Sequence, residues 1–135
     1  MKITRLLVLL LFAGSISSCH AQSSKDTQTQ KVSKTEDVKV YYFHLTRRCA
    51  TCKAVEKVSR EAVEEMGQAN VAFVEYNIEE DEGKAKAEEM AVSGQSLLIS
   101  DGAQKINLTQ KGFMYARTKP EKPKALVKKE IKGLL

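Results

Sequence analysis

The sequence contains no tryptophan, few other aromatic residues and no apolar run long enough to cross a membrane. A bilayer core of roughly 30 Å requires about 20 apolar residues, whereas the densest apolar segment, residues 6–12, is much shorter. The lysines are scattered among glutamates without an aromatic cluster beside them, so we expect no nucleic acid as a partner. At 135 residues the chain is long enough for one ordinary domain and too short for two.

The N-terminal segment falls into three successive zones. Lys2 and Arg5 supply positive charge, residues 6–12 are apolar, and a stretch of mostly small residues follows. The tetrapeptide Ile16-Ser17-Ser18-Cys19 then resembles the bacterial lipobox, in which an aliphatic residue and small residues precede a lipidated cysteine. The resemblance implies cleavage before Cys19 and a diacylglyceryl thioether on its sulfur. An ordinary cleaved signal in which Cys19 is incidental is the alternative.

Removal of a lipoprotein signal peptide spanning residues 1–18 would change both the location and the charge of the protein. The formal net charge would fall from +5 to +3, because the segment carries two positive charges. Residues 19–37 are rich in Ser, Thr, Gln and Lys and predict a flexible tether. We therefore expect a domain over residues 38–135 that is lipid-anchored through Cys19 and faces the periplasm or the cell exterior, where disulfides persist.

The pattern of residues 38–135 alternates between strand and helix. Strands are predicted over residues 38–44, 71–76, 96–100 and 104–108. Helices are predicted from the cysteine pair to residue 66, over residues 79–90, over residues 109–117 and over residues 119–134. The alternation predicts parallel pairing through right-handed crossovers, with an antiparallel hairpin at Asp101-Gly102.

Apolar periodicity indicates which residues of these elements are buried. The first two strands are apolar on both faces, as expected for strands covered on both sides. The last helix is predicted to pack through Ala125, Leu126, Ile131 and Leu134.

A pair of cysteines stands at the predicted junction between the first strand and the first helix. Cys49 and Cys52 are separated by two residues, so they can close a small disulfide with little rearrangement. At a helix N-terminus, free N–H groups and the helix dipole favour a thiolate and lower its pKa below about 8.5. Arg47 and Arg48 immediately precede the pair and add positive charge. Cys49 is therefore the predicted nucleophile and Cys52 the less exposed resolving thiol.

Two other interpretations of the cysteine pair stay open. A purely structural disulfide would stabilise the fold little, because so short a loop hardly restricts the unfolded chain. A structural zinc site usually needs four protein ligands, and beside a lipidated Cys19 only His44 and His20 remain as soft ligands. A site of two cysteines and His44, or four thiolates in a dimer, is the metal-binding alternative.

The order of elements, with Cys-x-x-Cys opening a helix after the first strand, resembles the thioredoxin superfamily. Residues 77–99 and the Asp101-Gly102 turn are similar to the thioredoxin segment from the second strand to the hairpin. The resemblance covers about residues 38–135 and implies a three-layer α/β sandwich with a central, mixed, four-stranded sheet. It also implies a redox-active disulfide that needs no organic cofactor. The implied partners are secreted or periplasmic proteins with thiols or disulfides, together with a redox partner protein.

Several positions depart from the thioredoxin pattern. Arg48 stands in place of the usual tryptophan, Ala50-Thr51 replaces Gly-Pro, and Phe43 occupies the position of the buried acid. Ser96 occupies the position of the cis-proline that faces the disulfide. A non-proline cis bond costs about 2.5–4 kcal/mol, so the bond before Ser96 is predicted to be trans.

The sequence thus predicts a membrane-tethered thiol–disulfide oxidoreductase in which Cys49 attacks and Cys52 resolves. Arg47 or Arg48 would stabilise the thiolate. A dithiol metal-binding lipoprotein and a non-catalytic adaptor of thioredoxin fold are the alternatives.

Overall fold

The computed structural model describes residues 37–135 and arranges them as alternating strands and helices. The elements in chain order are β1 (Val38–His44), α1 (Ala50–Met66), β2 (Val71–Asn77), α2 (Asp81–Glu89), β3 (Ser96–Ser100), β4 (Lys105–Asn107), α3 (Thr109–Tyr115) and α4 (Glu121–Leu134). None of the helices in this part of the chain is both long enough and apolar enough to cross a membrane.

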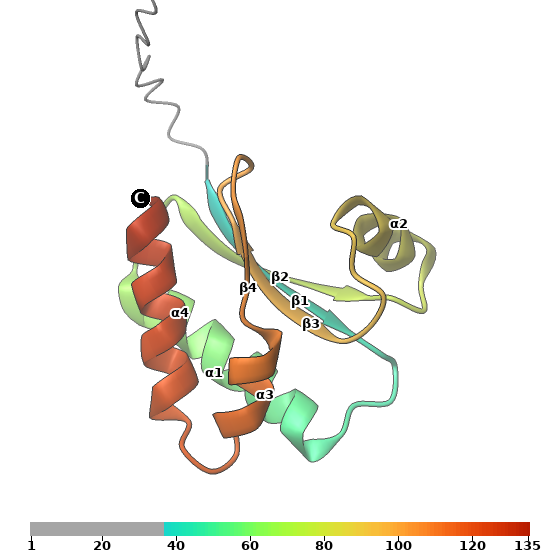
Figure 1. Cartoon of the computed structure of the whole chain (residues 1–135), viewed down its shortest axis with the longest axis horizontal. Helices are drawn as coiled ribbons and strands as arrows, with labels where there is room; N and C mark the ends of the chain where they lie inside the picture. Colours follow the sequence, from blue (N-terminus) through green and yellow to red (C-terminus); the bar gives the residue numbers. More distant parts are fainter. Residues whose placement is uncertain (1–36) are drawn as a thin grey trace, which may run out of the picture. The chain divides into compact units, whose positions relative to one another are not determined.

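The strands form one mixed sheet in the order β2-β1-β3-β4. β1 runs parallel to β2 and antiparallel to β3, and β4 is antiparallel to β3. Figure 1 shows α1, α3 and α4 on one face of this sheet and α2 on the other. The predicted fold class is therefore confirmed: the domain is an α/β structure with a mixed four-stranded sheet between helices, compatible with a thioredoxin-like sandwich.

The central strand β1 contributes side chains to two separate apolar cores, because successive side chains of a strand point to opposite faces. Val40 and Tyr42 lie in the larger core, which also contains residues of α1 and α4. Tyr41 and Phe43 lie in the smaller core beneath α2. Nearly every residue of β1 is buried, which holds the end of the strand, and the loop after it, in a defined position.

Helix α1 is the element that carries the cysteine pair, and it packs through a stripe of residues three and four apart. It ends at Gly67, whose φ of 57° lies in the left-handed region and whose N–H bonds the carbonyl of Glu64. The buried residues of the helix are Cys52, Val55, Val58, Ser59 and Ala62.

The structure corrects several details of the sequence expectations. β3 pairs with β1 antiparallel, although the alternation of strands and helices predicted parallel pairing there. β2 lies at an edge of the sheet and is only partly buried, although its apolar pattern suggested a strand covered on both sides. α2 begins at Asp81, because Asn77 Oδ1 accepts the N–H of Glu79 at 3.1 Å and holds the chain in a turn. In α4, Ala125 is exposed and Val127 is buried, since these positions lie about 200° apart around the helix.

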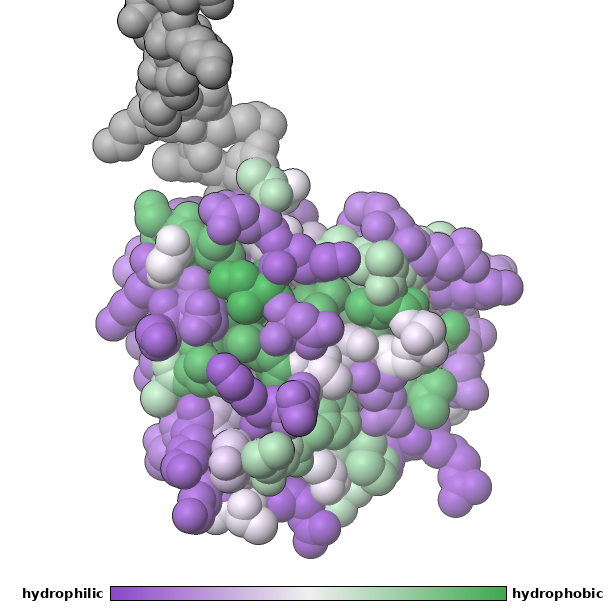
Figure 2. Space-filling view, viewed as in Figure 1, coloured by the Kyte–Doolittle hydropathy of each residue, from purple (hydrophilic) through white to green (hydrophobic). Residues whose placement is uncertain are grey.

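Hydrophilic residues cover most of the face seen in Figure 2, and apolar residues gather along β4 and the adjacent side of α4. Ile106, Leu126 and Leu134 are half-buried there and pack against the larger core. The apolar area is therefore the rim of that core.

Candidate functional site

The first cysteine occupies the cap position at the start of α1. Its backbone is extended (φ −73°, ψ 166°), and its Sγ accepts the N–H of Cys52 at 3.1 Å. This N–H belongs to the first turn of the helix, where backbone donors have no partner within the helix. Cys49 is exposed. Cys49 thus stands at the N-terminal, positive end of α1 as an exposed residue.

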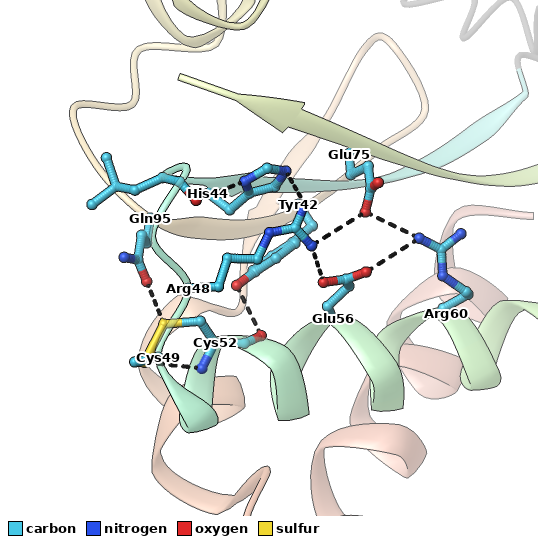
Figure 3. Close-up of polar contacts among 10 residues, drawn as sticks. Tyr42, His44, Arg48, Cys49, Cys52, Glu56, Arg60, Glu75 and Gln95 are labelled. Atoms are coloured by element: carbon cyan, nitrogen blue, oxygen red, sulfur yellow. Dashed lines mark hydrogen bonds and ion pairs between the residues drawn. A yellow bond between two sulfur atoms is a disulfide. The ribbon is translucent and has the colours of Figure 1, made fainter. Parts of the chain in front are cut away.

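The second cysteine faces the interior. Cys52 is 1% exposed, and its Sγ lies 2.22 Å from that of Cys49, with 5.0 Å between the two Cα atoms. The pair is a disulfide (Figure 3) and fits a redox-active Cys-x-x-Cys motif. Cys49 is an exposed residue and Cys52 a buried one, which is the asymmetry that separate attacking and resolving roles require.

Two side chains from other elements reach the turn that carries Cys52. The hydroxyl of Tyr42, on β1, donates to the carbonyl oxygen of Cys52 at 2.9 Å. Burial, reinforced by the negative charge of Glu56, raises the pKa of Tyr42 to about 12, so the phenol stays neutral. Gln95, just before β3, places Oε1 3.0 Å from Cys52 Sγ. Tyr42 therefore holds the backbone of the second cysteine by a hydrogen bond, and the amide oxygen of Gln95 lies against its sulfur.

A network of charged groups lies beside the cysteine turn, between α1 and β2 (Figure 3). Arg48 donates to Glu56, and Arg60 lies 3.0 Å from Glu75 and 3.5 Å from Glu56. Burial alone would raise the pKa of Glu56, but hydrogen bonds and the charge of Arg48 outweigh it and lower the pKa. The network contains two cations and two anions, so its charges are balanced.

His44 connects this network to the end of β1. It is 5% exposed, and its Nε2 lies 2.9 Å from a guanidinium nitrogen of Arg48. A guanidinium has no acceptor, so Nε2 accepts and Nδ1 carries the proton. Nδ1 then donates to the carbonyl oxygen of Leu45 at 3.1 Å. His44 thus anchors Arg48 at the end of β1. In the described part of the chain, no three His, Cys, Asp or Glu side chains are grouped as a metal site.

The two arginines before the cysteine pair have different surroundings. Arg47 is exposed. The guanidinium of Arg48 is held by Glu56 and His44, so its charge is matched by a carboxylate rather than left free beside the sulfur. The stabilisation of the Cys49 thiolate by these arginines stays a prediction.

Ser96 begins β3 opposite Phe43, at the position that the sequence analysis assigned to the missing cis-proline. It is buried, and its hydroxyl donates to the carbonyl oxygen of Gly94 at 3.0 Å. The peptide bond between Gln95 and Ser96 is trans, as predicted.

Five residues of the site were missed from the sequence: Tyr42, Glu56, Arg60, Glu75 and Gln95. Tyr42 was predicted only as a residue of the first strand. Gln95 had a signal, because it directly precedes Ser96, a position already assigned to the neighbourhood of the disulfide. The predicted signal peptide, the tether up to residue 36 and the lipidation site Cys19 lie outside the described residues.

Comparison with protein-family models, with curated proteins and with solved structures found no match to this chain.

Proposed function

We propose that the chain is a thiol–disulfide oxidoreductase related to the thioredoxin superfamily. The supporting observation is the unequal placement of the two sulfurs. Cys49 is exposed and accepts a backbone hydrogen bond at the start of α1, while Cys52 lies next to it and is 1% exposed. A structural disulfide gains nothing from an exposed sulfur at a helix N-terminus, whereas an attacking thiolate is stabilised there.

The reaction proceeds by two disulfide exchanges. In the reducing direction, the Cys49 thiolate attacks a substrate disulfide, forms a mixed disulfide and releases one substrate thiolate. Cys52 then attacks Cys49 Sγ, the intramolecular disulfide forms, and the second substrate thiol leaves. Two electrons pass from the dithiol to the substrate, and a redox partner protein restores the dithiol. The reverse sequence donates a disulfide, and the reduction potential relative to the compartment decides which direction operates.

The proposed location is outside the cytoplasm, with the domain tethered to a membrane through a lipid on Cys19 and facing the periplasm or the cell exterior. The lipobox-like sequence supports this location, and an oxidising compartment suits an exposed disulfide. Membrane fractionation of cells that express the wild type or Cys19→Ser tests it. We expect the wild type in the membrane fraction and Cys19→Ser in the soluble extracytoplasmic fraction. An equal distribution of the two proteins would contradict the lipid anchor.

Trapping of substrates tests the activity. Cys52→Ser leaves the attacking thiol but removes the resolving one, so substrate proteins should accumulate as mixed disulfides on Cys49. They should be visible on non-reducing gels of cells and disappear with reductant. Cys49→Ser is the matched control and should trap nothing. An absence of trapped species in both variants would count against an oxidoreductase.

Equilibration in dithiothreitol or glutathione buffers, with alkylation as readout, determines the direction. A potential near the −270 mV of thioredoxin would indicate a reductase, and one near −120 mV an oxidant of secreted thiols. If no reversible disulfide forms at any redox potential of the buffer, the oxidoreductase proposal fails. A bound metal that is lost in Cys49→Ser would then favour the dithiol metal-binding alternative.

A further inference from the structure

The resolving cysteine lies in surroundings that oppose its ionisation. Cys52 is 1% exposed, and burial disfavours the thiolate form of a cysteine. Phe43, six residues before Cys49, is fully buried in the apolar core on the other face of the sheet, so it places no acid beside Cys52. Some other group must stabilise the Cys52 thiolate if resolution is to be fast.

We propose that the side-chain amide of Gln95 positions and stabilises Cys52 during resolution, an inference that rests on the proposed oxidoreductase function. Gln95 Oε1 lies 3.0 Å from Cys52 Sγ, and Figure 3 shows the amide directed at the disulfide from the loop before β3. Gln95 is half-buried. The loop before β3 is the place where the thioredoxin pattern would put its cis-proline, so the amide occupies the space next to the missing ring.

A carboxamide can form a hydrogen bond with either protonation state of the thiol. Once the disulfide is open, the amide oxygen accepts a hydrogen bond from the Cys52 S–H. After rotation of the terminal torsion, the NH₂ group of the same amide donates to the Cys52 thiolate. This torsion is soft, and the two ends of the amide have nearly the same shape. A carboxylate at the same position accepts only, and its charge repels a thiolate.

The other side chains described near Cys52 are not placed to stabilise its thiolate. Tyr42, from β1, binds the carbonyl of Cys52 rather than its sulfur, and its phenol stays neutral. Glu56, one turn further along α1, is engaged by Arg48. Cys49 is the sulfur that Cys52 attacks.

The resolving step is balanced without a further reactant. The Cys52 thiol gives its proton to solvent water, the Cys52 thiolate bonds to Cys49 Sγ, and the bond between Cys49 and the substrate sulfur breaks. The substrate leaves as a thiolate and takes up a proton from solvent. Gln95 exchanges no proton with the solvent or the substrate, so it is a positioning residue.

Reaction of the dithiol with Ellman's disulfide reagent separates attack from resolution. The first release of nitrothiobenzoate reports attack by Cys49, and the second, which does not depend on reagent concentration, reports resolution by Cys52. The protein is the full chain with Cys19→Ser, which removes the third thiol. Gln95→Leu and Gln95→Glu are compared with this parent, and Gln110→Leu, on the exposed side of α3, is the matched control.

In Gln95→Leu we expect an unchanged first phase and a second phase slowed by about tenfold, because a hydrogen bond to a charged group is lost. In Gln95→Glu the pH dependence of the second-phase rate should shift to higher pH, and that of the first phase should not. Gln110→Leu should match the parent in both phases. Equal rates of the second phase in Gln95→Leu and the parent would overturn the inference, and so would equal slowing of both phases.

The outcome also distinguishes this inference from the proposed function. A parent that reacts in both phases, together with a normal second phase in Gln95→Leu, contradicts only the role of Gln95. A parent that never shows the second phase contradicts the oxidoreductase proposal and this inference with it. Far-UV circular dichroism of Gln95→Glu, which preserves the side-chain shape, verifies that the change acts on the chemistry and not on the fold.

Discussion

Replacement of Tyr42 by phenylalanine removes one buried hydroxyl from the helix turn that carries Cys52. Tyr42 is 0% exposed, and its hydroxyl donates to the carbonyl oxygen of Cys52 at 2.9 Å. The ring, which packs in the larger core, is retained in Tyr42→Phe. Loss of one such hydrogen bond lowers the free energy of unfolding by about 1 kcal/mol at neutral pH.

In alkali the stability difference between wild type and Tyr42→Phe should change sign. Burial is the main cause that raises the pKa of Tyr42 from 10.0 to about 12. Between these values the unfolded chain binds fewer protons than the folded one, so wild-type stability falls as the pH rises. The complete loss corresponds to about 2.7 kcal/mol. Because phenylalanine does not ionise, the wild-type advantage of about 1 kcal/mol should disappear near pH 11 and then reverse.

Urea unfolding followed by circular dichroism from about pH 8 to about pH 11.5 measures this difference directly. Both proteins are kept oxidised, so that the disulfide contributes equally. Tyr115→Phe, on α3, makes the same chemical change at a partly exposed position and should show no reversal. A stability difference between wild type and Tyr42→Phe that stays constant over this range would refute the burial argument.

Two further predictions concern the fold around the site. A Cβ at Gly83 would lie 1.9 Å from the backbone oxygen of Asn77, so Gly83→Ala should lower the free energy of unfolding by about 1–3 kcal/mol. Gly133→Ala, where a Cβ meets nothing within 4 Å, should raise it by about 0.5–1 kcal/mol, and an equal thermal midpoint for the two variants would contradict the close contact. The pKa of Glu56 is lowered from 4.5 because bonds to Arg48 outweigh its burial, so its stabilising effect is lost as the pH falls below this value. Urea unfolding of Glu56→Gln should therefore depend less on pH in this range, and an unchanged pH dependence would refute the role of the network.

The order and type of the elements could be predicted from the sequence because they depend on local patterns. Apolar periodicity located the strand of residues 38–44 and the helix that follows, and Gly67 marked the end of that helix. The two-residue spacing of the cysteines at a strand-to-helix junction indicated that Cys52 is less exposed than Cys49. These features involve residues close together in the chain, so their geometry follows from local backbone structure.

The partners of the cysteine pair were decided by the tertiary structure alone. Gln95 lies 43 positions from Cys52 along the chain, and only the antiparallel pairing of β3 with β1 brings its amide within 3.0 Å of the sulfur. The same holds for Glu75, which reaches Arg48 because β2 pairs with β1. No local pattern marks such contacts, because strand order and register determine them. The sequence by itself therefore determined the reactive pair and its position at the start of a helix, while the packing of the sheet decided which side chains surround it.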